Sequence, residues 1–562
     1  MFRKNEEYKQ HDLFGVTNAL SEKRHKMLEC SVEHVFFINV FSKIRECDFK
    51  VLYSSKKSRP NVPVNQLVAA LILKHLYNWT YNELFRNLNF NVLTRHAIGI
   101  QTLGEDIFSE ASIFNFQNRI IEYYLRSGKD LLTEIFDSLT REQLREFGVK
   151  TDIQRGDSFL IGSNIFDYSR LQLLIEILLR LYRIFEKEDI PIYSKLLEDY
   201  TKQTSGQYVY KIHKEDLPKE IEQLAKIYHD LYITIEKKYR KTSAFSIFKR
   251  VYNEHFVVLN KKIKVIPSGQ LNSGILMSPD DETATFHKKR EICSKGYCGH
   301  ISETSNPENK FNLITDIEIK PNNISDSKIL EDRIPEMVRK TPELKEYHTD
   351  GGYGSPKVDE LMEGNKINQI QTSISGRKAY AKISIIEADK NEYWATCEFG
   401  QKVKAEKTAR NWRAVFDNKK CLSCPLNQKC ATKKHMGKTK KSNRIWYFTL
   451  EKIRLHKREQ YYEKLPDKRK TLRANVEATV KEVKRGVKNG KVRIRCMVRI
   501  RFYLSMTSIA VNLTRIHKYL RSSNENFLNK TIIIHEYIPR DIGKDSLSFI
   551  NLNYITQNRN AA

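Results

Sequence analysis

The sequence predicts a mixed α/β protein with an all-α N-terminal domain, a helical insertion in its core and a small, basic, cysteine-rich insertion. Three observations lead to this class: capped, apolar-striped segments before residue 145, alternating strand and helix patterns up to about residue 375, and positive charge and cysteines gathered after it. A single hydrophobic core stops growing at about 250–300 residues, so a chain of 562 residues is expected to form several packed units.

Residues 1–145 are expected to be helical. The stretch PVNQLVAALILKHLYN, from Pro63, has a helical apolar stripe with proline at its start, and Thr80-x-x-Glu83 forms a capping box just after it. A third helix is expected to begin after the capping serine Ser109. Short helices joined by a tight turn are compatible with a helix-turn-helix DNA-binding domain and equally with an ordinary helical bundle.

The first part of the predicted core occupies residues 146–375. Its first strand is expected in GDSFLIGSN, with Asp157 at the head of an apolar run, and residues 169–262 have a helical pattern that indicates an insertion. Two strands, a helix, a strand, a helix and a strand follow, in GYCGHISET, FNLITDIEIKP, SDSKILEDRIPEMVRK, LKEYHTD, a helix from Ser355-Pro356, and KINQIQTS. That order implies an α/β sheet with at least one parallel crossover.

Three further segments complete the predicted organisation. Residues 376–470 form the basic, cysteine-containing insertion, residues 471–525 the second part of the core, and residues 526–562 a tail without a functional signal. The second part of the core is expected to contain one helix from Leu472 to about Val487.

The charge of the chain points to a polyanionic partner. Lys and Arg number 97 against 68 acidic residues, and residues 401–500 alone contain 31 basic and 8 acidic residues, which is +23 of the net +29. Nucleic acid is the first candidate and an anionic membrane surface the second. No apolar run approaches the ~20 residues of a membrane-spanning helix, and the N-terminus lacks the apolar centre of a signal peptide. We therefore expect a cytoplasmic protein whose nine cysteines are thiols or metal ligands.

The stretch HTDGGYGSPKVDE contains the first candidate catalytic group. Asp350 is expected at the carboxyl end of a strand, where reactive side chains gather in α/β sheets, and the glycines after it would let a metal or phosphate come close. Taken alone, an Asp-Gly pair is more simply a turn. An inward-pointing Asp157 on the first strand would also need a partner or a cation.

Glu477 is the third candidate carboxylate. In TLRANVEATVKEVKRG, Arg473 precedes it by four residues and Lys484 follows it by seven, so the three are expected on one helix face. Such a stripe is usually a solvated ion-pair surface. With two aspartates at strand ends, however, Glu477 would supply a ligand for Mg²⁺ or Mn²⁺, and the two basic residues would contact phosphates. Two such metal ions about 3.5–4 Å apart catalyse phosphodiester displacement.

Other acidic residues fit less well. Asp152 lacks a following strand pattern, Asp280 and Asp281 lie in SPDDETATF, and Glu482 is off the Glu477 face of the predicted helix.

Together these segments resemble the DDE transposases of bacterial insertion sequences, over roughly residues 10–520. QRGDSFLIGSNI, YHTDGGYGSPKVDEL and RANVEATVKEVKRG are similar to the motifs around the first Asp, the second Asp and the Glu, and RPNVPVNQLVAALILKHLYNWTYNELFRNL is similar to the N-terminal helical domain. One group of the family has a Tyr-x2-Arg-x3-Glu-x6-Lys signature, in which this chain has Lys470 at the Tyr position.

The resemblance implies a ribonuclease-H-like core in which Asp157, Asp350 and Glu477 bind two Mg²⁺ or Mn²⁺ ions while Arg473 and Lys484 bind DNA near the cut. It implies hydrolysis at terminal inverted repeats, transfer of the 3′-hydroxyl into target DNA, a homodimer or higher oligomer on DNA, and association with the nucleoid. Two alternatives remain: a metal-dependent nuclease of the resolvase type, and a decayed transposase that only binds DNA.

The cysteines predict a structural zinc site. Cys421-x2-Cys424-x5-Cys430 has the spacing of a zinc knuckle, and Cys397 is the expected fourth ligand, with His435 as its alternative. Unligated thiols in a loop are the simpler possibility. Cysteines similar to these occur in the insertion of related transposases. Cys293 and Cys298 are expected to be structural.

Overall fold

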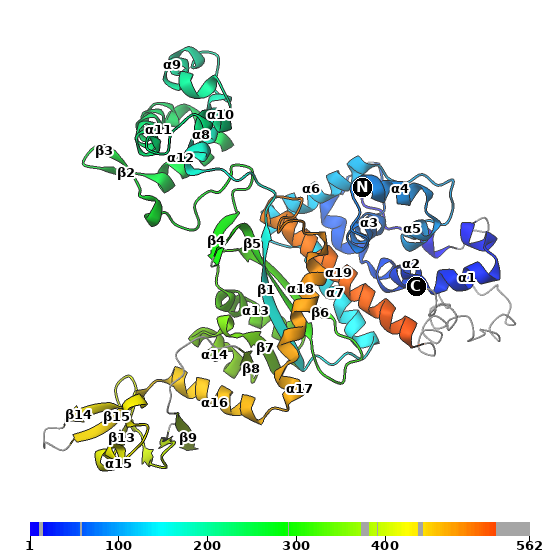
Figure 1. The fold of residues 1–562 in the computed structure, drawn as a ribbon. Coiled ribbons are helices and arrows are strands. Elements are labelled where there is room, and N and C mark those ends of the chain that lie inside the picture. Colours follow the sequence, from blue (N-terminus) through cyan, green and yellow to red (C-terminus); the bar gives the residue numbers. More distant parts are fainter. Residues whose placement is uncertain are drawn as a thin grey trace. The chain divides into compact units, whose positions relative to one another are not determined.

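The computed structural model describes residues 1–10, 15–56, 59–289, 291–372, 382–389, 392–436 and 442–523 (Figure 1). The predicted tail, 526–562, and the first residues of the predicted basic insertion, 376–381, lie outside the described residues. The chain divides into two compact units, each described by itself below. The first comprises Met1–Val149, Lys310–Leu313 and Phe502–Ala562, and the second comprises Lys150–Asn309 and Ile314–Arg501.

The first unit is helical where it is described. Its helices are α1 (Glu22–Glu29), α2 (Val32–Asn39), α3 (Val64–Leu76), α4 (Tyr81–Phe90), α5 (Val92–Ala97), α6 (Glu110–Ser127), α7 (Leu131–Glu146) and the later part of α19 (Met497–Ser522). The capping box predicted before α4 is present: the Thr80 hydroxyl accepts from the Glu83 amide at 3.2 Å, and Glu83 accepts from the Thr80 amide at 2.7 Å. Ser109 caps α6, as expected. The N-terminal helical region therefore agrees with the sequence prediction.

The second unit is built on a mixed six-stranded sheet (Figure 1). Its strands are β1 (Ile153–Gly162), β4 (Thr285–Lys289), β5 (Ile292–Thr304), β6 (Ile314–Pro321), β7 (Glu346–Asp350) and β8 (Asn368–Thr372). The order is β4-β5-β1-β7-β8, with β6 paired to β5. The pairs β1–β7 and β7–β8 are parallel, with α13 (Asp326–Lys340) and α14 (Pro356–Gly364) as the helices before β7 and β8. The predicted strands and helices occur in the predicted order and the parallel crossover is observed, but β4 and a hairpin at residues 256–265 were not predicted.

The first strand is longer than the sequence predicted. We expected Asp157 at its head, but β1 begins at Ile153, so Asp157 lies in the strand interior. The polar residues at the start of the strand gave no strand pattern in the sequence. In the structure their side chains are buried in pairs: Gln154 contacts Thr315 at 2.6 Å, and Arg155 contacts Glu303 at 2.7 Å. Paired polar groups can be buried without the cost that an unpaired group would have.

The helices between β1 and β4 have a core of their own. They are α8 (Arg170–Tyr182), α9 (Ile190–Thr201), α10 (Ser205–Tyr210), α11 (Leu217–Tyr239) and α12 (Ser243–His255), followed by the hairpin of β2 (Phe256–Leu259) and β3 (Lys262–Val265). Tyr228 stacks on Phe248 within this core, at 4.7 Å between ring centroids. None of the helices in the described part of the chain is long and apolar enough to span a membrane.

The described part of the basic insertion is mostly β structure. One sheet has the order β11-β10-β9 and another the order β12-β13-β15-β14. The strands are β9 (Ile383–Asp389), β10 (Glu392–Cys397), β11 (Lys402–Lys404), β12 (Glu406–Lys407), β13 (Trp412–Phe416), β14 (Lys433–Met436) and β15 (Ser442–Phe448). Their shared core is apolar, with Tyr393, Trp412 and Phe448 in contact. The short α15 (Asn418–Leu422) lies between β13 and β14, and α16 (Leu450–Lys464) and α17 (Asp467–Lys470) lead back toward the core sequence.

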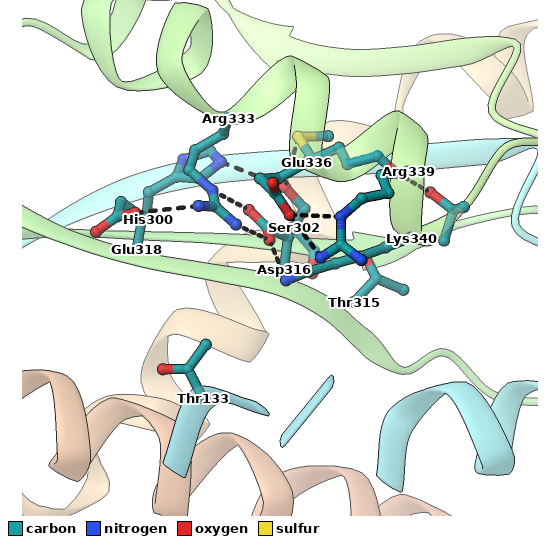
Figure 2. Close-up of polar contacts among 12 residues, drawn as sticks. Thr133, His300, Ser302, Thr315, Asp316, Glu318, Arg333, Glu336, Arg339 and Lys340 are labelled. Carbon is teal, nitrogen blue, oxygen red and sulfur yellow. Dashed lines mark hydrogen bonds and ion pairs between the residues drawn. The ribbon is translucent and has the colours of Figure 1, made fainter. Parts of the chain in front are cut away.

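Helix α13 is held on β6 by buried ion pairs (Figure 2). Arg333 donates to both Asp316 oxygens, at 2.5 and 2.9 Å, and to Glu318 at 3.2 Å, while Lys340 donates to Asp316 at 2.8 Å. Burial alone would raise the pKa of Asp316, but Arg333 and Lys340 outweigh it and hold that pKa well below its usual value. A paired charge network of this kind fixes the helix in one position, because breaking it would leave a buried charge unpaired.

The packing of Tyr347 against β1 can be tested at Gly156. A methyl group at residue 156 would lie 1.9 Å from the Tyr347 hydroxyl oxygen, which bonds to Ser302 at 2.7 Å inside the sheet. We therefore expect Gly156→Ala to lower the free energy of unfolding by about 2–3 kcal/mol or more, measured by urea denaturation. Gly364→Ala, at a position where a methyl group meets nothing within 4 Å, should leave it within about 0.5 kcal/mol. Equal stability of the two variants would contradict this packing.

Candidate active site

Asp157 and Asp350 are brought together by the parallel pairing of β1 with β7. Asp350 is the last residue of β7, as the sequence predicted, and Asp157 lies on the neighbouring strand. The guanidinium of Arg473 contacts both, with its Nη2 atom 3.1 Å from Asp157 Oδ2 and 3.8 Å from Asp350 Oδ2. The two carboxylates thus converge on one cationic group.

The loop after Asp350 is fixed by its own side chains. Asp350 Oδ1 accepts from the Gly352 amide at 2.9 Å and so caps the 3₁₀ turn η6 (Gly351–Tyr353). Tyr353 is fully buried, and its hydroxyl lies 2.9 Å from His300 Nδ1. A methyl group on Gly352 would lie 3.1 Å from Asp350 Oδ1, and one on Gly354 would lie 2.8 Å from the Gln371 amide nitrogen. These two glycines therefore provide room for neighbouring polar side chains.

Burial and nearby charge perturb Asp157. Burial raises the pKa of Asp157 to about 6, while Arg473 and the Ser158 amide act in the opposite direction and Asp350 and Asp326 add to the rise. A carboxylate crowded by other carboxylates and removed from water is costly to ionise without a cation beside it. This site therefore favours an added positive charge.

Glu477 lies on a shorter helix than the sequence predicted. Instead of one helix from Leu472 to Val487, the chain forms η8 (Leu472–Asn475), α18 (Val476–Val483) and η9 (Lys484–Gly486). Arg473 and Lys484 thus lie in 3₁₀ turns at the two ends, where helices often tighten. The prediction that both share one α-helical face with Glu477 is wrong. Glu477 is solvent-exposed in the first turn of α18, whose Val476, Thr479 and Val483 are buried.

A buried network of side chains attaches the Glu477 segment to the sheet. Arg155 on β1 pairs with Glu303 on β5 at 2.7 Å and donates to the Leu472 carbonyl at 2.8 Å. The other Glu303 oxygen accepts from the Thr479 hydroxyl at 2.8 Å. Turn η8 lies against β1 and β7, and α18 lies against β1. The segment with Arg473 and Glu477 is therefore held at the strands with the two aspartates.

The donor set suits a hard divalent cation, because carboxylate oxygens are the ligands that Mg²⁺ and Mn²⁺ prefer. Two of the three predicted ligands already face one positive group, Arg473. The third, Glu477, lies one helical turn after it. In the described part of the chain, no group of three or more His, Cys, Asp or Glu side chains is gathered closely enough to hold a metal. Asp157, Asp350 and Glu477 are thus not a closed ligand set in this structure.

The competing acidic residues have other partners. Asp152 accepts from Asn306 at 2.7 Å, and Asp280 pairs with Arg180 at 2.9 Å. Asp281 is buried and accepts from the Tyr297 hydroxyl at 2.6 Å and from the Cys496 amide at 2.9 Å. These contacts join separate segments of the second unit, which is a structural task.

Asp326, the first residue of α13, was not among the predicted site residues. Its carboxylate lies beside Gly352, and its charge acts on Asp157. The sequence Ser325-Asp326-Ser327 carries only the signal of a helix start.

The four predicted zinc ligands line one small pocket in the basic insertion. These ligands are Cys397, Cys421, Cys424 and Cys430. All four are free thiols; Gln401 donates to Cys421 at 3.4 Å and Thr432 donates to Cys430 at 3.3 Å. Burial raises the pKa of Cys421. The pocket gathers the thiols without the spacing of a metal-bound set.

Cys293 and Cys298 do not line this pocket. The side chain of His435 is not among those described. Cys298 is buried on β5 and Cys293 is exposed, both as free thiols.

Two family models match the chain. A model described as Transposase DDE domain matches residues 396–517, and one described as Transposase domain (DUF772) matches residues 24–119. The first range contains Glu477 and the four cysteines of the pocket, and the second contains most of α1, all of α2 to α5 and part of α6. No curated protein and no solved structure matches the chain.

The raised pKa of Asp157 predicts that, without metal, the difference in stability between the parent and Asp157→Asn depends on pH. The carboxylate ionises near pH 4 when unfolded and near pH 6 when folded, so stability falls as pH rises from 4 to 6. In EDTA, Asp157→Asn should therefore be as stable as the parent at pH 4. The variant should be more stable above pH 6, by at most about 3 kcal/mol.

The measurement is urea denaturation at several pH values, with Asp467→Asn as a surface control, since the Asp467 side chain is 97% exposed. If the parent is as stable as Asp157→Asn above pH 6, or more stable, the pKa of Asp157 is not raised.

Proposed function

We propose that this chain is a DDE transposase of an insertion sequence, which cuts DNA at the ends of its element and joins the freed 3′-hydroxyl to target DNA; the two matching transposase-domain models support this. The observation that carries the proposal is the convergence of Asp157 and Asp350 on Arg473, beside the segment that carries Glu477. Both substrates are DNA, which agrees with the charge of +29.

We infer that the mixed sheet is a ribonuclease-H-like core. Three antiparallel strands, β6, β5 and β1, are followed in space by the parallel strands β7 and β8, and two helices provide the crossovers. Such an order puts the carboxylates of β1 and β7 on adjacent strands, where a cation can be shared. The helical and basic insertions interrupt the sequence between core elements, so they can differ while the sheet is retained.

In the proposed site, Asp157, Asp350 and Glu477 would hold two Mg²⁺ or Mn²⁺ ions, which would supply activation of the attacking oxygen and stabilisation of the leaving one. The chain's own residues then bind and orient DNA. Arg473 offers a planar cation suited to phosphate, and Lys484 offers a second contact at the other end of α18. Binding of a divalent cation by the aspartates would replace the positive charge of Arg473. The Arg473 side chain could then leave the aspartates and bind a phosphate.

Basic side chains outside the site would bind the DNA backbone. Residues 401–500 carry a net charge of +23, and such contacts make DNA affinity fall steeply with salt. In the first unit, α4 and α5 are separated by Asn91 alone, which caps α5. This tight turn supports a DNA-reading role for the first unit.

A second candidate is a transposase copy that binds DNA without cutting it. The exposed Glu477, which has not closed on the two aspartates, favours this alternative. DNA binding would then persist while both chemical steps are absent.

The main prediction concerns the three carboxylates. With Mg²⁺ or Mn²⁺ and duplexes carrying the DNA ends that flank the gene, we expect the parent to cut and join DNA. Asp350→Asn and Glu477→Gln should each slow cutting by about 1,000-fold or more, because several kcal/mol of metal-dependent transition-state stabilisation are lost. Glu482→Gln, on the same helix, is the matched control and should cut like the parent.

Gel shift measures DNA binding in parallel, and all three variants should retain it. Cutting by Asp350→Asn or Glu477→Gln at the parental rate would show that the carboxylates are wrongly assigned. A parent that binds the ends but neither cuts nor joins them would support the DNA-binding alternative.

We also propose that the cysteine pocket binds one Zn²⁺ between Cys397, Cys421, Cys424 and Cys430. The support is that all four line one pocket and that thiolates are the usual ligands of closed structural zinc sites. Such an ion would stabilise the insertion together with its apolar core.

Metal analysis of protein purified without chelator should give about one equivalent of zinc. Cys424→Ser should reduce it below about half an equivalent, because a structural site needs all four ligands. Cys293→Ser, at an exposed free thiol, should leave the zinc content unchanged. Less than half an equivalent in the parent would exclude the site.

A further inference from the structure

We propose that Asp326, the first residue of α13, is a fourth carboxylate of the cation site and positions the ion held by Asp350. The inference rests on the proposed function, because it adds a residue to the same site. Asp326 is not one of the three carboxylates of the family resemblance and lies on the helix between β6 and β7.

The first line of evidence is the space above Gly352. A methyl group built on this residue would lie 3.1 Å from Asp350 Oδ1 and 3.3 Å from Asp326 Oδ2. Carboxylate oxygens from two different elements thus border the same small volume. That volume exists because residue 352 has no side chain.

The second line of evidence is electrostatic. The charge of Asp326 acts on the buried Cys298 of β5 and on the buried Tyr353 of turn η6, which directly follows Asp350. Asp326 is therefore close enough to β5 and to the turn after Asp350 to add to the negative potential there. A negative potential at this position attracts a divalent cation.

The third line of evidence is the fixed position of α13. Arg333 follows Asp326 by seven residues, so the two lie on one face of the helix. Arg333 faces β6 through its contacts with Asp316 and Glu318 (Figure 2). The ion pairs that hold Arg333 therefore also direct the first turn of α13 toward the sheet, and the Ser325 side chain caps that turn.

A purely structural role makes a different prediction. An aspartate in the first turn of a helix stabilises it by about 0.3–1 kcal/mol through the helix dipole. Loss of that effect would lower stability and leave the affinity for a cation unchanged. Cation affinity therefore separates the two roles.

The experiment measures Mn²⁺ binding to the full chain without DNA, by the electron paramagnetic resonance signal of free Mn²⁺. Asp326→Asn should weaken binding about tenfold, which is typical when a carboxylate that orients a metal site is lost. Asp326→Glu, which keeps the charge, should restore affinity to within about threefold of the parent. Glu331→Gln removes a carboxylate from the same helix, where it pairs with Lys328 at 3.2 Å, and should bind Mn²⁺ like the parent.

Asp350→Asn serves as the reference that separates this inference from the proposed function. If Asp350→Asn loses Mn²⁺ binding while Asp326→Asn binds like the parent, Asp326 is not part of the site and the proposed function stands. If Asp350→Asn binds Mn²⁺ like the parent, the site itself is wrongly assigned.

Thermal unfolding with and without saturating Mn²⁺ covers the case of an unstable variant. The Mn²⁺-induced rise in the unfolding temperature should be smaller for Asp326→Asn than for Glu331→Gln, whatever their stability in EDTA. Equal rises would overturn the inference.

Discussion

The buried ion pair between Arg155 and Glu303 joins the pieces from which the candidate site is assembled. It links β1 to β5, and its remaining hydrogen-bonding capacity is used by Leu472 and Thr479 on the segment that carries Glu477. Neither charge is accessible to solvent to any useful extent, since their side chains are 6% and 0% exposed. Loss of either partner would leave a buried charge unpaired, so the interaction permits few alternative positions of the segment.

Crowded like charges are the second constraint on this site. Asp157, Asp350 and Asp326 are held near one another by a sheet and a helix whose positions are fixed elsewhere, by backbone pairing and by the Arg333 and Lys340 contacts. The arrangement is unfavourable for an isolated protein, and Arg473 partly offsets it. Structural strain of this electrostatic kind is common at sites that bind metal ions, because the ion restores the balance.

The parts that sequence predicted well are those governed by local rules. The cap at Thr80, the helix after Ser109 and the alternation leading to β7 follow from hydrogen-bonding and apolar patterns within a few residues. The same local patterns place Asp350 at the end of its strand, whereas the pairing of β1 with β7 joins segments far apart in the sequence.

The features that the sequence-based prediction missed depend on partners elsewhere in the chain. The polar start of β1 looks unlike a buried strand until Arg155 meets Glu303, more than a hundred residues later. The segment around Glu477 is fixed by buried contacts of Leu472 and Thr479 with β1 and β5, and its two ends form 3₁₀ turns. Asp326 is indistinguishable from any helix-start aspartate until Gly352 is placed beside it.

The long separations along the chain have a consequence during synthesis. Strand β1 must await β5 beyond the helical insertion, and the Glu477 segment follows Asp350 by more than a hundred residues. At translation rates of about 5–20 residues per second, the last carboxylate emerges about ten seconds after the second. A nascent or truncated chain therefore carries most of its basic residues before it carries all three proposed carboxylates. Under the proposed function, an unfinished copy would hold DNA without cutting it.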